Sequence, residues 1–238
     1  MKKIMKFWPL FLALMMTVLP LQGFAANSNY VQLPDTAVVA ILESNEELSI
    51  DEIRTKSTKV KTEVLQASDP ALRNTSSVLV SEIYEYDQVL SRVQLADGTE
   101  VTRRAKTVIE EIQPRYNSET TKSENDGYYT HYITFYYNET TNGYATYYTL
   151  ESLKLSRSRT QNGGDMVSGT LTAYSLAESP KTTVSTVPMG TAGFYMNCPG
   201  HPPVIVTFGV ISGTLDYVLN INGVNYTRQW QTYLLHNS

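Results

Sequence analysis

The sequence predicts an all-β protein, an antiparallel β-sandwich or open barrel, preceded by a poorly defined and partly helical N-terminal segment. From Val78 onward, apolar and polar residues alternate in short runs, as they do in strands with one buried face. Turn signals rich in Gly and Asn separate these runs about every ten residues. Tyr and Thr, which favour strands, are abundant in the same part of the chain.

Residues 1–25 have the parts of a secretion signal. Three lysines lie within the first six residues, an apolar run follows from Phe7 to Leu21, and small residues around Ala25 offer a cleavage site. The apolar run is shorter than the ~20 residues that a membrane-spanning helix needs. We therefore expect cleavage at this point and a mature protein that is secreted or associated with the cell envelope.

The mature chain is acidic. Removal of the signal leaves 213 residues and, because it takes away three lysines and no acids, moves the formal charge from −4 to −7. Nucleic acids and anionic lipid surfaces attract clustered Lys and Arg, so neither is an expected partner. No later segment is apolar enough for a stable membrane span after cleavage. Cys198 is the only cysteine, which excludes an intramolecular disulfide and predicts a bacterial source.

Charge divides the mature chain into two parts. Residues 26–126 carry 18 acidic and 11 basic side chains, whereas residues 127–238 carry five of each. We assign residues 26–75 to a charged N-terminal segment of uncertain structure and residues 76–238 to an antiparallel β domain. The turn-like stretch 117–127 is either a further boundary or a long loop inside one domain.

The N-terminal segment allows two interpretations. Ile53, Val60 and Val64 have the spacing of one helical face, which Ser57 interrupts. Val60, Thr62 and Val64 also alternate as they would in a strand. Both interpretations stay open.

From Val78 onward each predicted strand is bounded by a turn. The strand at 203–211 is apolar on both faces, as expected of a strand that is covered on both sides. The predicted strands cover residues 89–95, 101–112, 128–137, 144–155, 166–176, 203–211, 215–221 and 224–230.

The last two strands give the most detailed prediction. Asn222-Gly223 tolerates positive φ at both positions, which favours a two-residue hairpin turn. Such a turn fixes the register and places one set of facing pairs on a buried face. The predicted pairs are Ile221–Val224, Leu219–Tyr226, Tyr217–Arg228 and Leu215–Trp230.

Tyrosines gather on two of the predicted strands. Tyr128, Tyr132 and Tyr136 share one face of the first strand, and Tyr144 and Tyr148 share one face of the next. A tyrosine-covered face that is not part of the core would form an aromatic platform for a sugar or a protein partner. These five tyrosines are the candidate binding residues. The alternative is that they only fill half-exposed strand positions, which Tyr suits.

The chain offers one minority candidate for a reactive site. Cys198 and His201 are three residues apart, and a thiolate–imidazolium pair would be a nucleophile. Their Pro-Gly and Pro-Pro surroundings favour a rigid turn instead. No Gly-x-Ser-x-Gly elbow is present, so we predict no catalytic residue.

Two further motifs are incomplete. Residues 124–127 resemble part of a calcium loop, but Lys122 and Ile133 stand where acidic ligands are needed. Residues 33–37 resemble a sortase signal, but they lie near the mature N-terminus and not before a C-terminal apolar stretch. We predict no metal site and no cofactor.

These observations favour a binding or structural role without catalysis. The partner is unknown, and an envelope glycan or protein held by the tyrosine-rich sheet is the sharper hypothesis. A first alternative is a pore-forming or bacteriocin-like toxin, because Thr149 to Ser175 resembles the amphipathic hairpins that such toxins insert. A second alternative is a hydrolase that uses Cys198 and His201.

Overall fold

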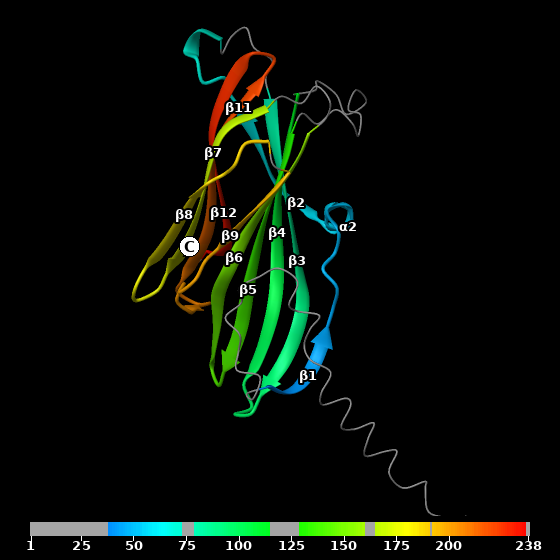
Figure 1. Cartoon of the computed structure of the whole chain (residues 1–238), viewed down its shortest axis with the longest axis vertical. Coiled ribbons are helices and arrows are strands. Elements are labelled where there is room, and N and C mark those ends of the chain that lie inside the picture. Colours follow the sequence, from blue (N-terminus) through cyan, green and yellow to red (C-terminus); the bar gives the residue numbers. More distant parts are fainter. Residues whose placement is uncertain (1–37, 73–78, 115–128, 160–164, 191, 237–238) are drawn as a thin grey trace, which may run out of the picture. The chain divides into compact units, whose positions relative to one another are not determined.

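The computed structural model describes residues 38–72, 79–114, 129–159, 165–190 and 192–236. Within these residues the protein is mostly β-structure, with one α-helix and a short 3-10 helix at Pro70–Leu72 (Figure 1). The α-helix and the strands are β1 (Val38–Ser44), α2 (Ile50–Lys56), β2 (Thr58–Leu65), β3 (Leu79–Leu95), β4 (Glu100–Pro114), β5 (Tyr129–Asn142), β6 (Ala145–Arg159), β7 (Asp165–Leu176), β8 (Lys181–Thr186), β9 (Gly193–Asn197), β10 (Val204–Ile205), β11 (Val210–Ile221) and β12 (Val224–His236).

The strands form two antiparallel sheets. Sheet A has the order β1-β3-β4-β5-β6-β10, with β2 also paired to β3 and β9 also paired to β6. Sheet B has the order β12-β11-β7-β8. The predicted all-β antiparallel class is therefore confirmed.

The N-terminal segment contains both a helix and strands. Ser49 caps α2: its hydroxyl accepts from the Glu52 N–H, and the Glu52 carboxylate accepts from the Ser49 N–H. The helix ends at Lys56, Ser57 has an extended backbone, and β2 begins at Thr58. The helical interpretation thus holds for Ile53, and the strand interpretation holds for Val60 and its neighbours on β2. Because β1 and β2 pair with β3, this segment belongs to sheet A.

Residues 115–128 join two strands of the same sheet. β4 and β5 flank this stretch and pair along their whole length, from Glu100–Thr141 to Ile112–Tyr129. The charge change near residue 126 therefore does not separate two sheets. Of the two predicted alternatives, a long connection inside one domain is the one that agrees with the pairing.

The C-terminal hairpin has the predicted register. All four predicted pairs occur, from Leu215–Trp230 to Ile221–Val224. Asn222 and Gly223 have φ values of 52° and 80°, as a two-residue turn of this kind requires.

Replacing Gly223 by valine tests this turn. A β-branched residue resists positive φ, so we expect Gly223→Val to lower the free energy of unfolding by about 1–3 kcal/mol in a denaturant titration. Nothing lies within 4 Å of an added Cβ, so the loss would come from the backbone and not from a clash. Asn222→Gly, which keeps the turn, is the matched control and should change little. An unchanged midpoint for Gly223→Val would contradict the turn.

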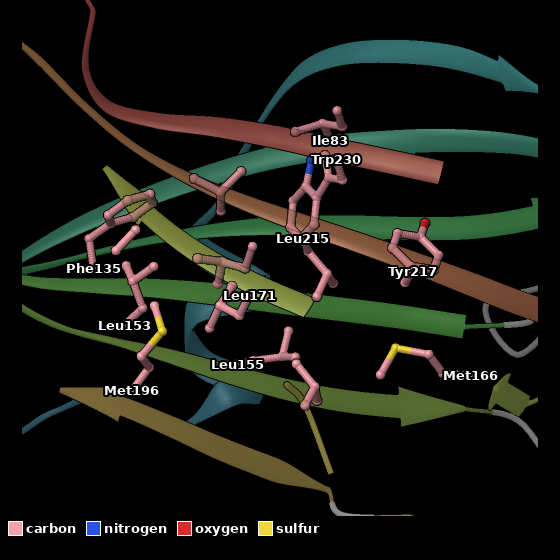
Figure 2. Packing of buried hydrophobic residues seen from close by; sticks show 14 of the residues in the cluster. Ile83, Phe135, Leu153, Leu155, Met166, Leu171, Met196, Leu215, Tyr217 and Trp230 are labelled. Carbon is pink, nitrogen blue, oxygen red and sulfur yellow. The ribbon is translucent and has the colours of Figure 1, made fainter. Parts of the chain in front are cut away.

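The main hydrophobic core lies between the two sheets. Figure 2 shows Trp230 beside its pairing partner Leu215, with Ile83 of β3 close by, and Phe135 and Leu153 of sheet A in the same core. All of these side chains are buried. The facing apolar surfaces of two sheets are thereby removed from water, which is the main stabilisation available to a β-sandwich.

The segment from Thr149 to Ser175 does not form a hairpin. Its first half lies in β6 of sheet A, and its second half lies in β7 of sheet B. The chain therefore passes from one sheet to the other at this point, and β6 and β7 do not pair with each other. No helix in the described parts of the chain is both long and apolar enough to cross a membrane.

Candidate functional site

A groove of about 730 Å³ lies between β12 of sheet B and the strands β2, β3 and β4 of sheet A. Among the described strands, β2 pairs only with β3, and β12 pairs only with β11, so each presents one free edge. We call this space the seam groove. It is lined by Val60, Lys61, Glu63, Ile83, Glu85, Lys106 and residues 228–236.

Arg228 of β12 joins the two sheets at one end of the seam groove. Its Nη2 donates to the carboxylate of Glu63 on β2, and its Nε donates to Oε1 of Glu110 on β4 (2.6 Å). Burial lowers the pKa of Arg228, but the two carboxylates raise it by more than burial lowers it. The pKa therefore lies above its ordinary value, and the guanidinium stays charged. A single cation thus holds one carboxylate from the edge and one from the interior of sheet A.

Glu110 lies behind Arg228 with its carboxylate fully buried. Besides the Arg228 bond, Oε1 accepts from the Ser81 hydroxyl (2.8 Å) and Oε2 accepts from the Tyr217 hydroxyl (3.0 Å). Burial alone raises the pKa of Glu110, but the Arg228 cation and the hydrogen bond from Ser81 act against it, and the pKa lies below its ordinary value. Glu110 is therefore an ionised anchor for Arg228.

His131 packs among aromatic rings beside this anchor. Its Nδ1 lies 3.5 Å from Oε2 of Glu110, and its ring centroid is 4.7 Å from that of Tyr129 and 4.6 Å from that of Tyr217. Within the described residues, both ring nitrogens and Nε1 of Trp230 have no hydrogen-bond partner. Burial lowers the pKa of His131, so the imidazole is neutral at pH 7.

The walls of the seam groove carry charges that are already paired. Lys61 pairs with Glu63, and Lys106 lies 3.0 Å from Glu85 while it donates to the Tyr233 carbonyl (2.9 Å). Three cations line the groove, and the three carboxylates that pair with them are Glu63 and Glu85 of the lining and the buried Glu110 behind it, so the charges balance. Its charged side chains act chiefly on each other.

Arg228, Glu63 and Glu110 form a charged cluster, of which the sequence predicted only Arg228. It placed Arg228 opposite Tyr217 on the buried face, which the register confirms, but it did not identify Glu63 or Glu110. The sequence did contain a signal for Glu110: it lies two residues from Val108 and two from Ile112, so it shares their apolar face of the strand. A carboxylate at such a position is rarely buried unless it is paired.

The five candidate tyrosines do not form one open platform. Tyr132 and Tyr136 are buried, Tyr148 is half-buried against Tyr137, and Tyr144 is fully exposed on the β5–β6 turn. Tyr128 lies outside the described residues. The structure therefore brings Tyr132 and Tyr136 together on the outer face of sheet A but covers both.

The cover comes from the N-terminal segment. Ile53 of α2 packs with Ile109 and Tyr132, and Glu47 accepts a hydrogen bond from the Tyr136 hydroxyl (2.5 Å). The ring of Tyr195 stacks on Tyr136 with 5.6 Å between centroids. The outward tyrosine face is thus covered by Ile53 and Glu47, which lie 79 and 89 positions before the tyrosines they contact, and by Tyr195 of β9.

Cys198 and His201 have separate surroundings. The Cys198 thiol is buried in the core between the sheets, and burial raises its pKa to about 12. The His201 ring lies 2.7 Å from the Ser175 hydroxyl at Nδ1 and 3.0 Å from the Thr183 hydroxyl at Nε2. The predicted turn is present, with Gly200 at a φ of 70°. Both imidazole nitrogens are thus bonded to sheet B, while the thiol packs in the core.

Alkylation tests the state of this thiol. We expect iodoacetamide to label native Cys198 roughly a hundredfold or more slowly than the denatured chain, because a buried thiol with a raised pKa supplies little thiolate. Mass spectrometry of the native and the denatured protein measures the two rates. Fast labelling of the native protein would support the Cys198–His201 pair instead.

The remaining sequence motifs give no site in the structure. Residues 33–37 and 124–127 lie outside the described residues. Over the described ranges, no group of three or more His, Cys, Asp or Glu side chains is placed to hold a metal ion.

The chain was compared with protein families, with curated proteins and with solved structures. It matches none of the family models, curated proteins or solved structures. Inferences about function therefore rest on its own residues.

Proposed function

We propose that this chain is an exported bacterial binding protein that holds a partner from the cell envelope in the seam groove. The signal-like residues 1–25 and the single cysteine support export from a bacterium. The seam groove supports binding, because it combines about 730 Å³ of space with two free strand edges.

One observation carries the proposal: the seam groove has unpaired strand edges but paired charges. Arg228, Lys61 and Lys106 are each engaged by a carboxylate. A highly charged ligand would have to break these pairs, whereas a neutral ligand can use the backbone edges and the apolar Val60 and Ile83. The tyrosine platform, by contrast, is largely covered at Tyr132 and Tyr136.

Export is tested by sequencing the N-terminus of the protein from the producing cell. We expect the protein outside the cytoplasm with a mature N-terminus at Ala26 or Asn27. A membrane-bound form that keeps Met1 would contradict export. Dye release from liposomes by the mature protein would favour the toxin alternative over the binding role.

Binding is tested with the mature protein on a glycan array and on a library of heptapeptides. Val60 and Val184 are both exposed valines on edge strands, and only Val60 lines the seam groove. We expect Val60→Trp to fill the groove and abolish binding of the hits, while Val184→Trp binds like the parent. Equal binding by both variants, or no hit on either array, would refute the seam groove as the site.

A further inference from the structure

We propose that the ligand of the seam groove is an extended polypeptide segment that pairs with β12 as an added strand. This inference rests on the proposed function and names the class of ligand. Four features of the groove lead to it: the direction of the backbone groups of β12, the closure of its free edge at both ends, the balance of charge and the position of the aromatic rings.

The two ends of the β12 free edge are already occupied. At one end, the Asn225 carbonyl accepts from the Ser68 N–H (2.9 Å), and the Thr227 N–H donates to the Ser68 hydroxyl (2.5 Å). At the other end, the Tyr233 carbonyl accepts from Lys106 Nζ (2.9 Å). Groups from sheet A and from the residues after β2 thus take the place that a neighbouring strand would have.

Between these ends the edge is open. Backbone groups of alternate residues point to the same side of a strand, and the pairing of β12 with β11 is continuous from Val224 to Tyr233. Since residues 225, 227 and 233 turn their groups away from β11, Gln229 and Gln231 do the same. Their N–H and C=O groups therefore face the seam groove, where no described strand pairs with them.

The open stretch suits a short strand. From Thr227 to Tyr233 it is ~20 Å long at ~3.3 Å per residue, which is room for about five residues. An added strand would form hydrogen bonds with the N–H and C=O groups of Gln229 and Gln231, and these would pair its own backbone groups. Exposed strand edges bind extended peptides in this way.

The groove walls favour a polypeptide over a sugar. Sugar binding usually uses an exposed aromatic face, but Trp230 is buried and Tyr233 lies against His236 with 4.5 Å between ring centroids. The cations are paired with Glu63, Glu85 and Glu110, so the groove does not select a polyanion. An extended peptide backbone is neutral and binds without an exposed aromatic ring, so it suits a groove that has neither an unpaired cation nor such a ring.

Backbone methylation of the peptide is the first test, on the mature parent protein. The probe is the tightest binder from a heptapeptide library in which Thr, Val and Ser alternate with randomised positions. Two versions carry N-methyl groups on alternate residues, offset from each other by one position. We expect one version to bind at least about tenfold more weakly and the other to bind like the unmodified peptide, because a strand presents only alternate amides to one edge.

A proline on the protein is the second test. Gln231→Pro removes an N–H that faces the groove and leaves the pairing with β11 intact, so we expect binding of the same peptide to fall about tenfold. Val184→Pro is the control, because the N–H of Val187 bonds to β7 and Val184 therefore faces the opposite, outer edge of sheet B. A thermal melt checks that both variants fold.

The outcomes separate the mode of binding from the site. Equal weakening by both methylated versions, or by neither, would overturn strand addition. If Val60→Trp still abolished binding in that case, the seam groove would stand as the site. Glycans that bind without any peptide would also overturn strand addition. If Gln231→Pro did not fold, the methylated peptides on the parent protein would decide alone.

Discussion

Replacing Trp230 by alanine will lower the free energy of unfolding by about 3–5 kcal/mol. Trp230 is 2 % exposed and belongs to the core between the sheets, where it lies beside Leu215 and near Ile83 (Figure 2). Its removal leaves a large cavity on the side of the core that is next to the seam groove. A denaturant titration followed by circular dichroism measures the loss.

The neighbouring Gln229→Ala is the matched control. The Gln229 side chain lies on the outer face of sheet B and donates to Asp216 (2.9 Å). We expect a change within about 0.5 kcal/mol, since the side chain is exposed. A Trp230→Ala protein as stable as the parent would contradict the observed register, because Trp230 would then have to lie on the solvent side.

Replacing Arg228 by methionine will cost about 3–5 kcal/mol, because it leaves the buried Glu110 carboxylate without its cation. Glu110 has no exposed surface, and the Ser81 and Tyr217 hydroxyls alone do not neutralise its charge. The double variant Arg228→Met with Glu110→Gln removes both charges. We expect it to recover much of the loss, and a failure to recover would show that Arg228 acts mainly through Glu63 or through packing.

His131 and Glu110 will make the parent protein less stable in acid. The pKa of His131 is lowered in the folded state, so the unfolded state gains protons first as the pH falls below the ordinary value of 6.5. The pKa of Glu110 is lowered as well, so its contribution is present above the ordinary value of 4.5 and is lost as the pH falls through the folded value. Both effects reduce stability toward low pH.

Arg228→Met will shift this acid transition upward. Loss of the cation removes one of the causes that hold the pKa of Glu110 down, so the carboxylate takes up its proton at a higher pH. Denaturant titrations between pH 4 and pH 8 follow the change. An acid transition at the same pH in the parent and the variant would contradict the ionised state of Glu110.

The sequence by itself determined much of the local structure. The predicted strand at 203–211 was wrong, because only Val204–Ile205 form β10, a turn with an exposed Phe208 follows, and β11 begins at Val210. Alternation of apolar and polar residues predicts strands because side chains on a strand point to opposite faces in turn. Asn222-Gly223 predicts the register of the last hairpin, because few residues tolerate positive φ at two successive positions. Turn and alternation act within a few residues, so they can be read without the rest of the chain.

Only the tertiary structure decided which surfaces are open. The tyrosine pattern predicts that Tyr132 and Tyr136 share a face, but their burial depends on Ile53 and Glu47 from a distant segment. In the same way, alternation over Thr149–Ser175 shows two strands but does not show that they belong to different sheets.

The candidate site also depends on the tertiary structure. Arg228 meets Glu110 and Glu63, which lie 118 and 165 positions earlier in the chain. No periodicity links such residues, and their contact depends on how sheet A packs against sheet B. A buried charge is stable only where a partner of opposite sign lies beside it, and that partner is set by packing and not by the local sequence.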